Sequence, residues 1–273
     1  MRIDLSLIRN FLHRVKTSRL RASALVALWF LCAGMANAQI PAPLPVDPAS
    51  AVGPGMPAPI ADNRIFAHVL FDQFEGRTSG PNSQFRWDGE AWVGTDMNKL
   101  WLKSEGFANR SAVSDGDQEA LYDRPIPHTR YLDGQVGVRA DLDSGPARTW
   151  AAIGIEGLAP YYFQFAPTLY IRDGGNVAGR LTGSYDLLVT QRLILQPEAE
   201  MNFYNKDDPG RRTGSGLSDL DAGLRLRYEI NRKFAPYVGF AYNGKYGGTA
   251  QYSRLAGEST SNPRFIFGLR LWY

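Results

Sequence analysis

Side chains that could bind a metal ion are few in this chain. Beyond residue 38 there are two histidines, His68 and His128, three methionines and no cysteine. Imidazole and carboxylate groups both suit divalent transition metals, and Asp72 follows His68 at a spacing that places both side chains on one face of a strand. The candidate metal-binding residues are therefore His68, Asp72, Glu90 and Met97. His128 lies between a proline and a threonine, which predicts an exposed turn.

A second set of charged residues alternates with apolar ones and could line an enclosed interior. It contains Arg86, Asp88, Glu198, Glu200, Asp219, Asp221, Arg225 and Arg227, with Arg192 and Arg270 beside them. Such a dense set of charges can stabilise a narrow or plugged interior through ion pairs, or it can attract a cation along a path. The balance of opposite charges favours the first alternative.

The elements that carry these residues are long alternating segments. In residues 219–230, 192–203 and 132–142, apolar residues occupy one face and mostly polar or charged residues the other. A period of two predicts strands. Runs of 10–14 residues exceed the usual strand of a soluble sheet and match the length of a tilted strand that crosses a bilayer. An apolar outer face and a polar inner face are typical of a transmembrane β-barrel.

The fold predicted is an all-β, transmembrane antiparallel barrel of about twelve strands, with ten as the alternative because the third and fourth strands are weak. The strands are expected near residues 64–75, 83–94, 97–105, 117–124, 130–142, 148–157, 161–171, 176–189, 191–204, 218–230, 234–246 and 263–273. The longer connections, such as 205–217 and 247–262, are expected on the outside of the cell and the short turns, such as 231–233, on the periplasmic side. Tyrosines near strand ends, among them Tyr161, Tyr170 and Tyr237, are expected in aromatic girdles.

Two segments precede the predicted barrel, which covers residues 63–273. Residues 1–38 are basic, then apolar over 22–33, and end in Ala-Asn-Ala, which predicts a secretory signal peptide. Residues 39–62 contain seven prolines and predict a flexible periplasmic segment. The signal peptide holds six Lys and Arg against one acidic residue, Asp4, so the remaining chain is slightly acidic and a nucleic-acid partner is not expected.

A family resemblance adds to this interpretation. The stretches 85–98 (FRWDGEAWVGTDMN), 98–106 (NKLWLKSEG), 157–162 (GLAPYY), 185–200 (YDLLVTQRLILQPEAE), 206–209 (KDDP) and 214–239 resemble the copper resistance protein B family of outer-membrane proteins. The last strand also resembles the recognition signal of outer-membrane barrels, because Phe265, Phe267, Leu269 and Leu271 alternate up to the terminal Tyr273.

The resemblance implies a role in tolerance of excess copper, with copper ions bound or passed at the outer membrane. The expected partners are outer-membrane lipid, copper ions and a periplasmic copper-handling protein that docks on residues 39–62. Family members often carry a Met- and His-rich tail before the barrel, whereas this segment offers only Met56. The alternative is a porin or structural barrel that is indifferent to metals.

No enzyme is predicted. A hydrolase needs a nucleophile, a base and an orienting group within hydrogen-bond reach. Neither His68 nor His128 has a serine two residues further on, which is the spacing in outer-membrane lipases.

Overall fold

The computed structural model describes residues 64–78, 83–109, 113–129, 131–142 and 147–273. The predicted signal peptide, 1–38, and the Pro-rich segment, 39–62, lie outside the described residues. One compact unit, His68–Trp92 with Met97–Tyr273, holds nearly all of the sheet. The described residues of the other unit are 64–67, at the start of the first strand, and 93–96, at the end of the second.

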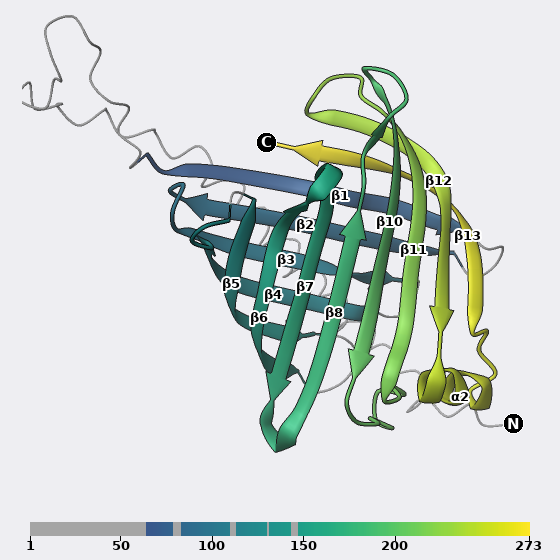
Figure 1. Ribbon diagram of the computed structural model, residues 1–273. Coiled ribbons are helices and arrows are strands. Elements are labelled where there is room, and N and C mark those ends of the chain that lie inside the picture. Colours follow the sequence, from purple (N-terminus) through teal and green to yellow (C-terminus); the bar gives the residue numbers. More distant parts are fainter. Residues whose placement is uncertain (1–63, 79–82, 110–112, 130, 143–146) are drawn as a thin grey trace, which may run out of the picture. The chain divides into compact units, whose positions relative to one another are not determined.

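The described chain is almost entirely β-strand (Figure 1). The strands are β1 (Phe66–Thr78), β2 (Gln84–Gly94), β3 (Lys99–Ala108), β4 (Val113–Pro125), β5 (Leu132–Asp141), β6 (Arg148–Ala159), β7 (Phe163–Arg172), β8 (Asn176–Ser184), β9 (Leu187–Leu188), β10 (Leu193–Tyr204), β11 (Gly216–Tyr228), β12 (Phe234–Lys245) and β13 (Ser261–Trp272). The prediction of twelve long strands is confirmed. β9 is a two-residue addition within the predicted segment 176–189.

The sheet closes on itself as an antiparallel barrel. Consecutive strands pair along the chain, β1 pairs with β13, and β11 pairs with both β10 and β12. Twelve strands form the wall, and β9 adds only a short pairing to β10. Closure leaves no long unpaired strand edge, so the backbone groups of the wall are bonded within the sheet.

The barrel is polar inside and apolar outside. On β11, Arg225 and Arg227 are buried, whereas the intervening Leu224 and Leu226 are exposed on the outer surface. On β12 the exposed Val238 and Phe240 alternate with smaller or buried residues in the same way. This inverted pattern is the one expected of a barrel whose outer wall faces hydrocarbon. No helix in the described part of the chain has the length and apolar character needed to cross a membrane.

The two ends of the barrel differ in the length of their connections. At one end, called the loop end here, residues 205–215 join β10 to β11, and helix α2 (Gly247–Leu255) lies between β12 and β13. At the other end, called the turn end, the connections include η3 (Pro160–Tyr162) and residues 229–233. β1 begins at the turn end and β13 ends there. The two long connections predicted at residues 205–217 and 247–262 are therefore present at one end, but β7 and β8 are joined at that end by only η4 (Asp173–Gly175).

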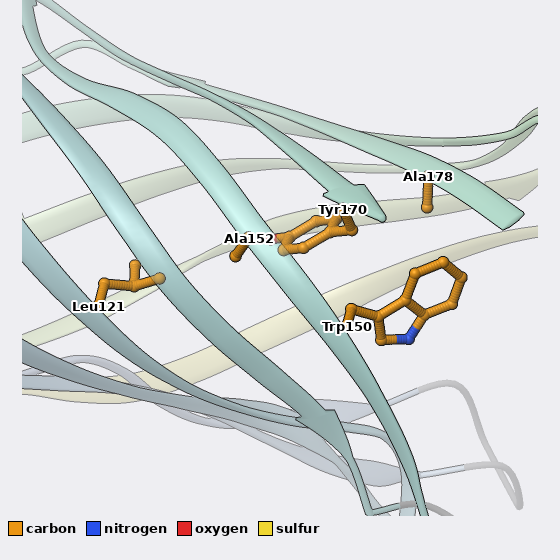
Figure 2. Close-up of a cluster of buried hydrophobic side chains, with 5 residues drawn as sticks. All are labelled: Leu121, Trp150, Ala152, Tyr170 and Ala178. Atoms are coloured by element: carbon orange, nitrogen blue, oxygen red, sulfur yellow. The ribbon is translucent and has the colours of Figure 1, made fainter. Parts of the chain in front are cut away.

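A small apolar cluster fills part of the interior on the side of β4, β6, β7 and β8. Figure 2 shows its five buried members, Leu121, Trp150, Ala152, Tyr170 and Ala178. Trp101 and Tyr204 pack against it. Its place beside charged residues means that the interior is filled by apolar contacts on one side and by polar contacts on the other.

Candidate functional site

A β-bulge in β1 determines which of its residues enter the lumen. Asp72 and Gln73 together stand opposite a single residue of β13, Arg270. A bulge adds one residue and shifts the alternation beyond it. As a result, Gln73, Glu75 and Arg77 are fully buried inside the barrel, although strict alternation from Asp72 would place them on the outer face.

Glu75 is the centre of a buried cluster on β1, β11 and β12. Its carboxylate accepts hydrogen bonds from Arg77 Nε at 2.8 Å, from Arg225 Nε at 3.0 Å and from the Tyr237 hydroxyl at 2.9 Å. Arg77 also donates to Asp221 at 2.5 Å. Both arginines are buried with the carboxylate. The hydrogen bonds between them therefore replace the hydration that each charged group loses on burial.

A glycine makes the contact between β1 and β12 possible. Gly268 on β13 stands between Glu75 and Tyr237, each of which is its neighbour in register. A Cβ at Gly268 would lie 2.7 Å from both the Glu75 side chain and the Tyr237 hydroxyl. Only glycine therefore lets these two side chains meet above the strand between them.

Four residues from two opposite parts of the wall form a closed ring of ion pairs, called the Arg–Glu ring here. Arg86 on β2 contacts Glu105 on β3 at 3.6 Å and Glu200 on β10 at 3.3 Å. Arg180 on β8 contacts Glu200 at 3.4 Å and is also paired with Glu105. Each carboxylate thus bridges both arginines, and each arginine bridges both carboxylates.

Neighbouring groups hold the Arg–Glu ring in place. Arg86 donates to the Gln73 side chain at 2.7 Å and stacks on the Phe107 ring, with its guanidinium carbon 4.8 Å from the ring centroid. Arg180 donates to Asp117 at 2.5 Å, and Arg139 pairs with the same carboxylate at 2.8 Å. These contacts restrict the rotamers of both ring arginines.

Two lumenal carboxylates differ from all of these, because they have no bonded partner. Asp88 and Glu90 follow Arg86 on β2 toward the turn end and are half-buried. Within the described ranges of the chain, neither side chain makes a hydrogen bond or an ion pair. Both lie within electrostatic range of Asp72 and of Lys103, and Asp88 also of Arg86. Asp88 and Glu90 therefore have cations near them but, among the described residues, no hydrogen bond or ion pair to one.

A pocket of about 280 Å³ lies in the turn-end half of the barrel. It is lined by Trp101, Asp123, Tyr131, Asp133, Glu156 and Gly157. Its carboxylates already have cationic partners, because Lys99 bridges Asp123 and Asp133 at 3.4 and 2.8 Å. Lys103 forms an ion pair with Glu156 at 2.5 Å.

The predicted metal-binding residues do not form a ready-made metal site. His68 lies beside two tryptophan rings, with centroid distances of 5.6 and 6.1 Å, and Asp72 accepts a hydrogen bond from Arg270 at 2.5 Å. Met97 is exposed in the connection between β2 and β3. In the part of the chain that the structure describes, no three His, Cys, Asp or Glu side chains are arranged to hold a metal ion.

The remaining residues of the predicted charge network are engaged at several points of the lumen. Glu198 pairs with Arg225 at 3.0 Å, and Arg227 pairs with Asp186 at 2.8 Å. Asp219 accepts a hydrogen bond from an asparagine on β10 at 2.9 Å. The prediction that Arg192 lies beside them in the lumen is wrong, because Arg192 is exposed in the turn before β10.

Several lumenal residues were not predicted from the sequence, and two tyrosines were misplaced. The missed residues are Gln73, Glu75, Arg77, Glu105, Asp117, Glu119 and Arg180. In β4, the acidic residues Asp117, Glu119 and Asp123 share one face with Leu121 and are a usable signal. Nothing local marks the bulge in β1. Tyr170 and Tyr237 are buried in the lumen and bonded to glutamates, so their assignment to an aromatic girdle is wrong.

One ion pair at the loop end has a clear electrostatic consequence. Arg148, at the start of β6, pairs with Asp208 in the connection between β10 and β11. Burial alone would raise the pKa of Asp208, but the hydrogen bond and the charge of Arg148 outweigh it and hold this pKa below its ordinary value. Asp208 therefore stays ionised and ties this connection to the barrel wall.

Comparison with known proteins assigns the chain to a family. Residues 65–273 match the family described as copper resistance protein B precursor. Copper resistance protein B of Escherichia coli is 42% identical over 214 residues, which cover 78% of this chain and 72% of that protein. The copper resistance protein B homolog of Pseudomonas syringae pv. tomato is 41% identical over 214 residues, with the same shares of the two chains.

Solved structures similar to the chain include two porins. The NanC porin matches with a TM-score of 0.47 and 12% identity, over 76% of this chain and 99% of that chain. The KdgM porin matches with a TM-score of 0.42 and 13% identity, over 75% and 98%. On the sequence matches, which span the whole barrel, the chain is an outer-membrane β-barrel protein of the copper resistance protein B family.

Proposed function

We propose that this protein supports copper resistance at the outer membrane by binding copper ions inside its barrel and passing them across. The observation that carries the proposal is the pair Asp88 and Glu90, two lumenal carboxylates without a bonded partner in the described chain. Carboxylate oxygens are acceptable ligands for Cu(II), and an unpaired carboxylate loses no existing ion pair when a cation binds. The proposed function requires no catalytic step.

The arrangement suits brief binding better than storage. Asp72 lies within electrostatic range of both carboxylates, so several carboxylate groups would be near a copper ion here. It would nevertheless keep water in its coordination shell, because no three-residue metal site is formed among the described residues. Passage requires binding that is strong enough for an ion to enter and weak enough for it to leave.

His68 and Met97 are proposed as secondary contacts near the turn end. Imidazole suits Cu(II) and thioether suits Cu(I), and Met97 is exposed. In the proposed orientation the turn end faces the periplasm, where residues 39–62 would dock a copper-handling protein. The apolar outer wall would contact lipid.

The alternative is a barrel that is indifferent to metals, and the extent of ion pairing in the lumen favours it. The Arg–Glu ring and the Glu75 cluster satisfy most lumenal charges internally. The two functions differ in what Asp88 and Glu90 do, since a structural barrel does not need unpaired carboxylates.

A copper titration of the purified protein distinguishes the two. In the double variant Asp88→Asn, Glu90→Gln we expect affinity for Cu(II) to fall by roughly tenfold or more, which corresponds to about 1.4 kcal/mol or more. The matched control is Asp173→Asn, because Asp173 is a 96% exposed carboxylate outside the lumen. Equal affinity in the wild type, the double variant and the control would contradict the proposal and favour the structural alternative.

A further inference from the structure

The Arg–Glu ring joins opposite sides of the barrel wall. β2 and β3 supply Arg86 and Glu105, and β8 and β10 supply Arg180 and Glu200. Along the sheet, four strands separate β3 from β8, and four separate β10 from β2 on the other side. The ring therefore crosses the lumen instead of following the wall.

The space beside the ring is filled. Phe107 packs under Arg86 and Arg77, with guanidinium-to-centroid distances of 4.8 and 5.0 Å. On the opposite side Tyr170 donates to Glu119 at 2.6 Å and stacks with Arg139 at 4.5 Å, and the apolar cluster of Figure 2 lies around it. Open aqueous channels belong to wider barrels of 16–18 strands, so side chains can close the lumen of this one.

The two carboxylates without a bonded partner in the described chain lie on one side of the ring. Asp88 and Glu90 lie on β2 between Arg86 and the turn end. The acidic residues in register with the ring carboxylates, Asp117 opposite Glu105 and Asp221 opposite Glu200, are each paired with an arginine. The Arg–Glu ring therefore lies between these two carboxylates without a bonded partner, Asp88 and Glu90, and the loop end.

We propose that the Arg–Glu ring is the barrier that keeps the lumen closed, and that Arg86 and Arg180 decide which ions pass it. To cross the ring, an ion must displace an arginine from a carboxylate that both arginines contact. A monovalent alkali cation binds carboxylate oxygen only weakly, whereas a transition metal forms a direct bond to carboxylate oxygen and can replace the guanidinium. This selectivity rests on the proposed function, but the closure itself does not.

Single-channel recordings in planar bilayers with KCl and no copper test the closure alone. We expect the wild-type protein to stay at baseline. Two double variants each break the ring: Arg86→Gln with Arg180→Gln, and Glu105→Gln with Glu200→Gln. Both should give a steady conductance. The first leaves lumenal carboxylates in excess and should prefer cations, whereas the second leaves arginines and should prefer anions, so their reversal potentials in a salt gradient should have opposite signs.

Asp173→Asn is the matched control and should remain at baseline, and circular dichroism with heat-dependent gel mobility shows which variants have folded. The two variants change the charge in opposite directions, so either one that folds tests the proposal. Steady conductance of the wild type, equal to that of a ring variant, would overturn it. So would a folded ring variant that stays at baseline. Because no copper is present, neither result depends on whether Asp88 and Glu90 bind it.

Discussion

At the scale of single residues, the charges in the lumen differ in what they do, and Glu75 is the clearest structural one. It is fully buried and bonded to Arg77, Arg225 and Tyr237. Removing one partner of a buried ion pair leaves an uncompensated charge. The predicted result of Glu75→Ala is a loss of about 3 kcal/mol in the free energy of unfolding, measured by denaturant unfolding in detergent or lipid.

The comparison for this measurement is Asp173→Asn, which removes an exposed carboxylate and should change stability by less than about 0.5 kcal/mol. If Glu75→Ala were as stable as that control, the Glu75 cluster would not stabilise the barrel, and the interpretation of the lumenal pairs as structural would fail.

The loop-end pair of Arg148 and Asp208 predicts a dependence on pH. The pKa of Asp208 is lowered in the folded protein, so the pair stabilises the connection above the ordinary aspartate pKa and is lost as pH falls through the lowered value. In Arg148→Ala we expect the Asp208 pKa to rise, as measured by NMR titration of its carboxyl carbon. An unchanged titration in that variant would show that Arg148 does not set this pKa.

Single residues were predictable from sequence where the alternation is unbroken. Arg225 and Arg227 on β11 fall on the inner face because the register with β12 runs without interruption there. Tyr170 was not predictable, because a tyrosine near a strand end suits a membrane interface and a buried hydrogen bond equally well. Only the three-dimensional position of Glu119 distinguishes the two.

At the scale of elements, the bulge in β1 is the feature that brings Gln73, Glu75 and Arg77 into the lumen. Deleting Asp72 would remove the extra residue and leave these three side chains on the inner face, with loss of the Asp72–Arg270 pair only. We therefore predict that the protein lacking Asp72 folds into a barrel, as shown by its gel mobility before and after heating.

A deletion in a regular strand is the matched comparison. β11 pairs with β12 in unbroken register around Leu224, so deleting Leu224 would force either Asp221 or Arg225 onto the apolar outer wall. We expect this deletion to prevent folding. Equal folding of both deletions would mean that the strands tolerate a change of register, and that the bulge is not what places the β1 charges.

The number and bounds of the strands were predictable because length and a period of two are local properties of the sequence. The bulge was not, since Phe71, Asp72 and Gln73 read as ordinary alternation until the partner strand is known. The split of the predicted strand 176–189 into β8 and the short β9 is a similar case, because it depends on pairing with β10.

At the scale of the whole molecule, the barrel combines a paired barrier with an unpaired acidic site. The Arg–Glu ring joins β2 and β3 to β8 and β10, whereas Asp88 and Glu90 lie on its turn-end side without partners in the described chain. The sequence indicated which of these residues face inward in β2 and β10. It could not indicate the ring, because pairs across a lumen depend on the curvature and closure of the whole sheet.

The proposed function requires that this lumen passes copper in preference to other solutes. The direct measurement is entry of Cu(II), calcium, potassium and a small sugar into liposomes that carry the purified protein, with the Asp88→Asn, Glu90→Gln double variant beside the wild type. We predict that copper enters faster than the other three and that the double variant removes this preference. Equal entry of all four solutes, or entry of none, would contradict the claim.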